Sequence, residues 1–168
     1  SAPLRDGSVD LETGVVSRTT APELRVQALF RDRLIGVVRI GHALSQGEIT
    51  PERYAAGRHL CVSRRGLVQG PIDEALKLFG LERAVVTIVS GFATALAFAR
   101  VSDLIASVPE RHTDSLRAGM HAFSLPIATP AITVSLHWHP RMDADPAHRW
   151  LRGCVREVCA PAIAESSR

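Results

Sequence analysis

The sequence predicts an α/β protein with a mainly parallel sheet, and three observations lead to this expectation. Strand-like segments alternate with helix-like segments over most of the 168 residues. One segment, residues 34–40, is almost continuously apolar, as in a strand that is buried on both faces. Near the C-terminus, apolar residues recur at the spacing of a helix that lies on a sheet.

Strands are expected where β-branched residues alternate with polar ones or form short apolar runs. Residues 24–29 alternate apolar and polar side chains, the period of a half-buried strand. Residues 84–89 form a β-branched run of the kind found in buried strands. In chain order, the expected strands are residues 9–16, 24–29, 34–40, 59–62, 84–89, 103–108 and 132–138.

Helices are expected where a capping residue precedes an apolar face. Thr50 and Pro51 supply an N-cap and a first-turn proline for a short helix, and Gly80 marks the end of a second one. In chain order, the expected helices are residues 51–56, 71–79, 92–101, 109–118 and from 146 onward. Apolar faces are formed by Ile72, Ala75, Leu76 and Phe79 in the second helix, and by Trp150, Leu151, Cys154, Val155, Val158 and Cys159 in the last.

Composition excludes several classes of function. Hydrophobic residues make up 46% of the chain and charged residues 22%, which is typical of a globular protein and argues against disorder. No apolar run approaches the roughly 20 residues needed to span a bilayer. No signal peptide is recognised in the polar residues 1–10. We therefore expect no membrane partner.

Charge and cysteine content narrow the choice further. The net charge of +3 comes from scattered arginines, since Lys77 is the only lysine, and aromatic residues are 5%. Direct nucleic-acid binding by this segment is therefore not expected. Cys61, Cys154 and Cys159 form no Cys-x-x-Cys pair, and their odd number argues against a disulfide framework. Both features fit a reducing cytoplasm.

Two predicted strand-to-helix turns have the chemistry of a ligand site. In α/β folds, ligands bind at the carboxyl ends of strands, close to helix N-termini that attract carboxylates. Residues 63–66 offer a hydroxyl, guanidinium groups and backbone amides. In the second turn, after Ser90, Gly91 permits close approach of a ligand to the backbone, and Phe92 offers an apolar wall. Ordinary capped turns remain the alternative for both segments.

Histidines and carboxylates near the C-terminus suggest a metal site, which we weigh against a structural role. His137 and His139 would share one face of the last strand, as two zinc ligands do, with Asp143 nearby. However, Pro140 interrupts the strand, and no compact ligand motif is present. No metal or other cofactor is therefore expected. No nucleophile with an adjacent base is recognised, so an enzyme is not expected; a metal hydrolase using the three residues named above is the third hypothesis.

The sequence of residues 137–152, His-Trp-His-Pro-Arg-Met-Asp-Ala-Asp-Pro-Ala-His-Arg-Trp-Leu-Arg, resembles the C-terminal end of LysR-type transcriptional regulators. It is most similar to the branch that contains nodulation regulators and regulators of aromatic degradation. Shorter stretches agree in order and spacing: residues 4–11, 29–34, 41–44, 54–59, 70–73 and 103–109. The resemblance runs from about Leu4 to Ala160.

The resemblance implies an effector-binding domain of the type II periplasmic-binding-protein-like fold. Such a domain has two α/β lobes joined by two crossover strands, here about residues 33–40 and 132–138, and binds a small molecule in the cleft between them. The first lobe would comprise residues 1–32 and 133–168, and the second residues 33–132. The effector-binding candidates are Ser17, Arg18, Ser63, Arg64, Ser90, Gly91 and Phe92.

Two departures from the family pattern accompany the resemblance. The winged helix-turn-helix of the family is absent from this chain, and so is the start of the first lobe, which is therefore expected to be incomplete at its N-terminus. We expect self-association, as a dimer or tetramer, to cover the exposed edge or face. The implied function is that of a cytoplasmic regulatory domain that senses a small molecule, such as an aromatic or other carboxylate. It would control transcription only through the absent DNA-binding domain. The alternative is a periplasmic solute-binding protein of the same fold.

Overall fold

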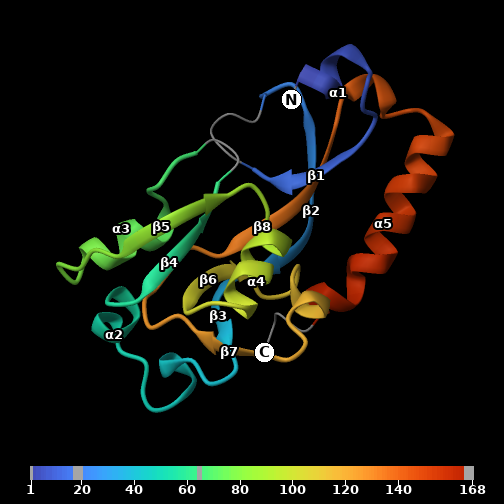
Figure 1. Ribbon diagram of the computed structural model, residues 1–168. Helices are drawn as coiled ribbons and strands as arrows, with labels where there is room; N and C mark the ends of the chain where they lie inside the picture. Colours follow the sequence, from blue (N-terminus) through green and yellow to red (C-terminus); the bar gives the residue numbers. More distant parts are fainter. Residues whose placement is uncertain (1, 17–20, 64–65, 165–168) are drawn as a thin grey trace. The chain divides into compact units, whose positions relative to one another are not determined.

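The computed structural model describes residues 2–16, 21–63 and 66–164, the last four of these by their backbone alone. Contacts within the chain divide it into two units. Unit 1 comprises Ser1–Asp32 and Ile132–Arg168, and unit 2 comprises Arg33–Ala131. Each unit has its own sheet (Figure 1).

Unit 1 is built on a three-stranded sheet with the order β1-β8-β2, in which both pairings are antiparallel. Its core consists of Leu29, Leu136 and Trp138, against which Val155 and Cys159 of the last helix pack. That helix contacts β2. The elements of unit 1 are α1 (Ala2–Asp6), β1 (Glu12–Val15), β2 (Arg25–Asp32), β8 (Ile132–Trp138) and α5 (Pro146–Ala164).

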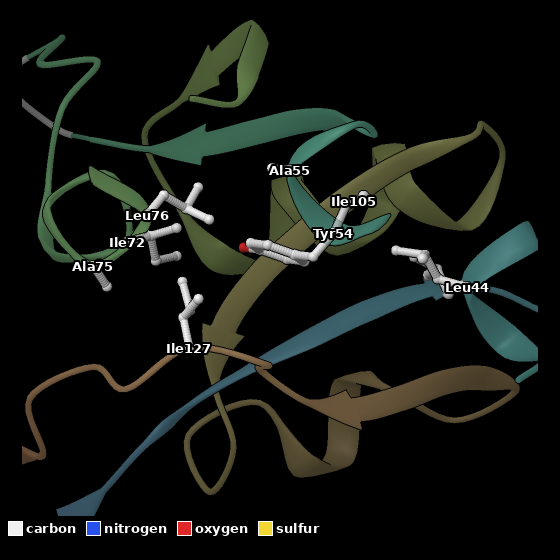
Figure 2. Packing of buried hydrophobic residues seen from close by; sticks show 9 residues of the cluster. Leu44, Tyr54, Ala55, Ile72, Ala75, Leu76, Ile105 and Ile127 are labelled. Atoms are coloured by element: carbon white, nitrogen blue, oxygen red, sulfur yellow. The ribbon is translucent and has the colours of Figure 1, made fainter. Parts of the chain in front are cut away.

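Unit 2 is built on a five-stranded sheet with the order β5-β4-β6-β3-β7. Successive residues of β6 enter different apolar clusters, because side chains alternate between the faces of a sheet. Ile105 packs with α2 and α3 (Figure 2), and Ala106 packs with α4. The elements are β3 (Leu34–Arg39), α2 (Pro51–Ala55), β4 (Arg58–Val62), α3 (Pro71–Lys77), β5 (Ala84–Val89), α4 (Phe92–Arg100), β6 (Leu104–Pro109) and β7 (Met120–Ser124).

Local sequence signals account for several helix boundaries. The Thr50 hydroxyl accepts a hydrogen bond from the Arg53 amide, and Pro51 opens α2, as predicted. Gly80 follows α3 with a φ of +69°, a conformation that favours glycine, and this confirms it as the stop signal. The prediction that Phe79 lies on the buried face of this helix is wrong: the residue is 54% exposed, because α3 ends at Lys77.

The α/β class is confirmed, but the expectation of a mainly parallel sheet is wrong. Within the described residues, only β4–β5 and β4–β6 pair in parallel. The other pairings, in both sheets, are antiparallel. A parallel pair requires a crossover connection, and only α3 and α4 provide one between strands of the same sheet.

The predicted helix over residues 109–118 is also wrong. Pro109 is the last residue of β6 and lies opposite Leu34 in the sheet. A turn and a short 3-10 segment follow, and the chain then enters β7, which was not predicted. The segment is polar and offers no apolar stripe to bury, and Thr113 donates its hydroxyl to the Pro109 carbonyl (2.6 Å), which stabilises the turn.

The last helix is present as predicted, but its apolar stripe is only partly buried. Val155 and Cys159 pack against the core of unit 1. Trp150 is 71% exposed and Val158 is 80% exposed, and Leu151 is exposed as well. Only one side of the apolar stripe therefore packs against unit 1, and the other side is exposed. No helix among the described residues is long and apolar enough to cross a membrane.

Candidate effector-binding site

The carboxyl ends of three strands meet at one edge of the unit 2 sheet, because β4 is parallel to both β5 and β6. Ser63 follows β4 directly, and Ser90 and Gly91 follow β5. The Ser63 amide donates a hydrogen bond to the Val89 carbonyl (2.9 Å), which ties the two strand ends together. His112 lies three residues beyond the end of β6. This edge is the position at which α/β folds bind ligands.

Ser63 also organises the loop that follows it. Its hydroxyl accepts a hydrogen bond from the Leu67 amide (2.9 Å), four residues along the chain. This contact matches the capped-turn alternative considered from the sequence. The hydroxyl hydrogen is still able to donate to a ligand, since the bond to Leu67 uses only an acceptor site of the oxygen.

The N-terminus of α4 is open and lacks a counter-charge in its own first turn. Gly91 is the N-cap, with extended backbone angles, and the first intrahelical bond runs from the Ala95 amide to the Gly91 carbonyl (3.1 Å). Apart from its chain neighbours, no atom in the part of the chain that the structure describes lies within 4 Å of a Cβ added at Gly91. No acidic residue lies in the first turn. The amides of that turn and the positive end of the helix dipole are therefore suited to a carboxylate.

The N-terminus of α3 differs in its charge. The Gly70 amide donates to the Asp73 carboxylate (2.8 Å), so this helix supplies its own anion. Arg83 in turn donates two hydrogen bonds to the same carboxylate. The α3 terminus is thus neutralised within the protein, whereas that of α4 has no capping side chain.

Two aromatic rings stand beside the open helix end. The Phe92 and His112 ring centroids are 5.8 Å apart in an edge-to-face arrangement. Phe92 is half-buried against the α4 cluster, while His112 is exposed. His112 was not predicted as a site residue, because residues 109–118 were assigned to a helix. Its position just after a strand that ends at this edge was the signal that could have identified it.

The structure thus brings four of the predicted residues to one edge of unit 2. These are Ser63, Ser90, Gly91 and Phe92. The other three candidates, Ser17, Arg18 and Arg64, lie outside the described residues.

Several buried polar side chains of unit 2 are hydrogen-bonded to one another or to the backbone, outside the apolar cluster of α4. The Tyr54 hydroxyl and the Ser107 hydroxyl are 2.8 Å apart, and His59 Nε2 is 2.8 Å from the Tyr54 carbonyl. Burial lowers the pKa of His59 to about 4 and raises that of Tyr54. His59 is therefore neutral near pH 7 and donates from Nε2, which fixes the short connection between α2 and β4.

The C-terminal motif is occupied by structural contacts. Asp143 accepts hydrogen bonds from the Trp138 indole (2.6 Å) and from Arg25 Nε (3.0 Å). These donors, the indole first, hold the pKa of Asp143 below its usual value. His139 Nδ1 accepts from the Arg141 amide (3.3 Å). Among the described residues, no three His, Cys, Asp or Glu side chains are placed to hold a metal ion.

The same motif connects the N-terminal segment to α5. The Arg141 guanidinium donates to the carbonyls of Leu4 and Arg5, at 2.8 Å in each case. His148 Nε2 lies 2.9 Å from the Asp10 carbonyl. Arg152 stacks over the Trp138 ring at 4.6 Å. The C-terminal motif of the family resemblance, residues 137–152, therefore makes structural contacts within unit 1.

A pocket of about 290 Å³ lies between β2 and α5 of unit 1. It contains none of the predicted site residues. Its lining consists of Ala28, Leu29, Gly153, Arg156, Glu157 and Ala160.

The fold and the strand-end site define an α/β domain of the kind that binds small molecules. Residues 1–160 match the sequence model of the family described as the LysR substrate binding domain. The chain belongs to this family, and the predicted resemblance is confirmed.

Curated relatives are transcriptional regulators. The regulator SyrM of Rhizobium meliloti (strain 1021) is 32% identical over 162 residues, which are 95% of this chain and 49% of SyrM. The activator NahR of Pseudomonas putida is 27% identical over 151 residues, which are 89% of this chain and 50% of NahR. The chain thus spans about half the length of the curated relatives it matches.

Solved structures agree with the fold class. The regulatory domain of MexT, a transcriptional activator in Pseudomonas aeruginosa, has a TM-score of 0.78 at 27% identity and covers 93% of this chain and 76% of its own. A putative transcriptional regulator from Vibrio parahaemolyticus has a TM-score of 0.82 at 25% identity, with coverages of 99% and 78%. The effector binding domain of QuiR, solved with shikimate, shares the fold (TM-score 0.76) at 14% identity, with coverages of 96% and 77%.

Proposed function

We propose that this chain is the sensing part of a transcription regulator and that it binds a small-molecule carboxylate at the N-terminus of α4. One observation carries the proposal: the helix end at Gly91 is open and has no acidic residue in its first turn, and the Phe92 and His112 rings stand beside it. The helix end suits the carboxylate, and the rings suit an aromatic or other flat body of the effector.

The lobe assignment is part of the same proposal. Residues 1–32 and 133–168 are assigned to the first lobe, and residues 33–132 to the second. Arg64 is proposed to add a guanidinium from the second lobe. Ser17 and Arg18 are proposed to complete the effector site from the first lobe.

Control of transcription is proposed to require parts outside this chain. The curated relatives SyrM and NahR, 32% and 27% identical to this chain, are named as HTH-type (helix-turn-helix) regulators. We therefore propose that DNA contact occurs through a DNA-binding domain of the full-length protein, in the cytoplasm, and that the protein self-associates as a dimer or tetramer. No catalytic step is assigned to the chain, and the relatives favour this reading over a periplasmic solute-binding protein.

Calorimetric titration of the chain tests the effector site. Benzoate and shikimate provide a carboxylate on an aromatic and on a non-aromatic ring, and benzamide provides the ring without the charge. We expect at least one of the two acids to bind, and benzamide to bind about tenfold more weakly than benzoate, because it brings no charge to the helix end.

Two matched glycine variants locate the site. Gly91→Ala adds a methyl group where, chain neighbours apart, no atom of the described residues lies within 4 Å, so it clashes with none of these and obstructs the ligand. Gly70→Ala makes the same change at the N-cap of α3, also without a neighbour within 4 Å. We expect the first to weaken binding about tenfold and the second to leave it unchanged. Binding of neither acid, or equal effects of the two variants, would contradict the proposed site.

A further inference from the structure

The two connections between the units differ in length. Asp32 and Ile132 are opposite each other in the last rung of the β2–β8 ladder. Leu34 already pairs with Pro109 in the sheet of unit 2. The first connection therefore has Arg33 as its single residue between two ladders. The second connection, residues 125–131, has seven residues between β7 and β8.

Arg33 and Glu110 contact each other through both backbone and side chain. The Glu110 amide donates to the Arg33 carbonyl (2.9 Å). Arg33 donates from Nε and Nη2 to the two carboxylate oxygens of Glu110, at 2.5 and 3.0 Å. These hydrogen bonds, with the nearby guanidinium charges, hold the pKa of Glu110 below its usual value. The Arg33 side chain is 60% exposed, so salt screens this pair.

The second connection is held by a different kind of contact. Ile127 is buried in the apolar cluster of α2 and α3, where it points toward Ile72 (Figure 2). Pro126 and Pro130 flank it and restrict the backbone. This anchor is apolar and does not respond to ionic strength in the way that the Arg33–Glu110 pair does.

Glu110 is also close in sequence to the proposed effector site. It is two residues from His112, whose ring meets Phe92. The turn that carries both is braced, since Thr113 donates to the Pro109 carbonyl (2.6 Å) and Arg117 donates to the Glu110 carbonyl (2.9 Å). His112 and Glu110 therefore belong to one hydrogen-bonded turn.

We propose that Arg33 is the hinge residue between the two units and that Glu110 fixes it, so that a ligand that contacts His112 acts on the hinge through Glu110. The role of the ligand rests on the proposed function, whereas the hinge itself does not. The Arg33–Glu110 ion pair is exposed and therefore weak. A ligand-induced shift of the turn then changes the fraction of molecules in which the pair is formed.

Distances between spin labels on the two units test the hinge in the absence of ligand. The three native cysteines are replaced by serine in the 168-residue chain, and labels are attached through Glu48→Cys and Arg149→Cys, which are exposed positions of unit 2 and unit 1. We expect Glu110→Gln to broaden the distance distribution about 1.5-fold, because the pair that holds Arg33 is lost. Raising NaCl from about 0.05 to about 1 M should broaden the unsubstituted distribution but not that of Glu110→Gln.

Two further variants keep this test decisive. Asp114→Asn removes another carboxylate of the same turn, which pairs with Arg117 at 2.9 Å, and should leave the width unchanged. Arg33→Gln should broaden the distribution as Glu110→Gln does, and the double variant should broaden it no further, because the two side chains act as one pair. Equal widths for Glu110→Gln and Asp114→Asn in folded protein, judged by circular dichroism, would overturn the hinge assignment.

A ligand series separates the hinge from the effector site. If benzoate binds, it should shift the mean distance in the unsubstituted chain, and Glu110→Gln should still bind it while losing at least about half of the shift. An equal shift in both would overturn the link through Glu110. If neither benzoate nor shikimate binds, the proposed effector function fails, and the ligand-free comparison still decides the hinge.

Discussion

Arg83 donates two parallel hydrogen bonds to Asp73, from Nε to Oδ1 (2.8 Å) and from Nη2 to Oδ2 (2.9 Å), and the two side chains are 4% and 14% exposed. Burial alone would raise the pKa of Asp73, but the hydrogen bonds and charge of Arg83 outweigh it and lower the pKa. The same carboxylate caps α3 through the Gly70 amide. One residue thus joins the start of a helix to the segment that leads into β5.

Asp73→Asn should destabilise the protein strongly. The amide oxygen is still able to cap α3, but Arg83 is left as an uncompensated buried charge, a change that costs about 3–5 kcal/mol. Urea unfolding followed by circular dichroism measures the free energy of unfolding. Asp114→Asn, at an exposed ion pair, is the control and should cost less than about 1 kcal/mol. Similar losses for the two variants would show that the buried pair has no special role.

Acid should destabilise the protein through His59. Its pKa is about 4 in the folded protein and 6.5 as an ordinary value, because burial penalises the charged form. Between these values the unfolded chain binds a proton that the folded protein does not, so stability falls as the pH is lowered from 6.5 toward 4. The loss is on the order of 3 kcal/mol.

His59→Gln isolates this effect, because glutamine retains an N–H donor for the Tyr54 carbonyl but does not titrate in this range. Unfolding free energies at about pH 6.5 and pH 4.5 should differ less for the variant than for the unsubstituted chain. Asp73 and Glu110 have lowered pKa values, so their contribution is lost only at more acidic pH. Parallel pH profiles for the two proteins would exclude His59 as the titrating group.

Gly36→Ala should destabilise unit 2 through a single ring. A Cβ at this position of β3 would lie 2.2 Å from the Phe123 ring on the neighbouring strand β7, and an aromatic ring cannot move aside as easily as an alkyl end. The expected cost is about 1–3 kcal/mol. Thermal unfolding should show that Phe123→Leu, although destabilising alone, reduces the cost of the Gly36→Ala change. Strict additivity of the two substitutions would contradict the steric account.

Local rules made the strand-to-helix turns predictable. Thr50 and Gly80 mark helix ends by their own chemistry, and Gly91 lies where an apolar strand meets an apolar helix. These signals involve neighbours in sequence. They were therefore sufficient to place Ser63 and Ser90 just after strands and Phe92 at the start of a helix.

Tertiary pairing decided the features that the sequence did not reveal. β7 is short and weakly patterned, and it is a strand because it pairs with β3, where Gly36 makes room for Phe123. His112 was missed as a site residue because a helix was predicted over residues 109–118, where the structure has a turn. The burial of the α5 stripe was overestimated because helical periodicity indicates which residues share a face and not how much of that face has a partner.

We predict that copies of this chain associate through the exposed side of α5. Trp150 and Val158 lie there with 71% and 80% of their surface exposed. Exposed apolar surface of this kind is unfavourable in water and is typical of interaction sites. We expect the chain to form a dimer or larger oligomer in light scattering at high concentration, and Trp150→Glu to reduce its mass toward that of a monomer without lowering the melting temperature. Ala160→Glu introduces the same charge at an exposed position of the helix that, at about 100° per residue, lies on a different face from Trp150 and Val158, and it should leave the mass unchanged. A monomer at every concentration would refute self-association of this chain, and equal effects of the two variants would place the interface elsewhere, because the charge alone would then account for the dissociation.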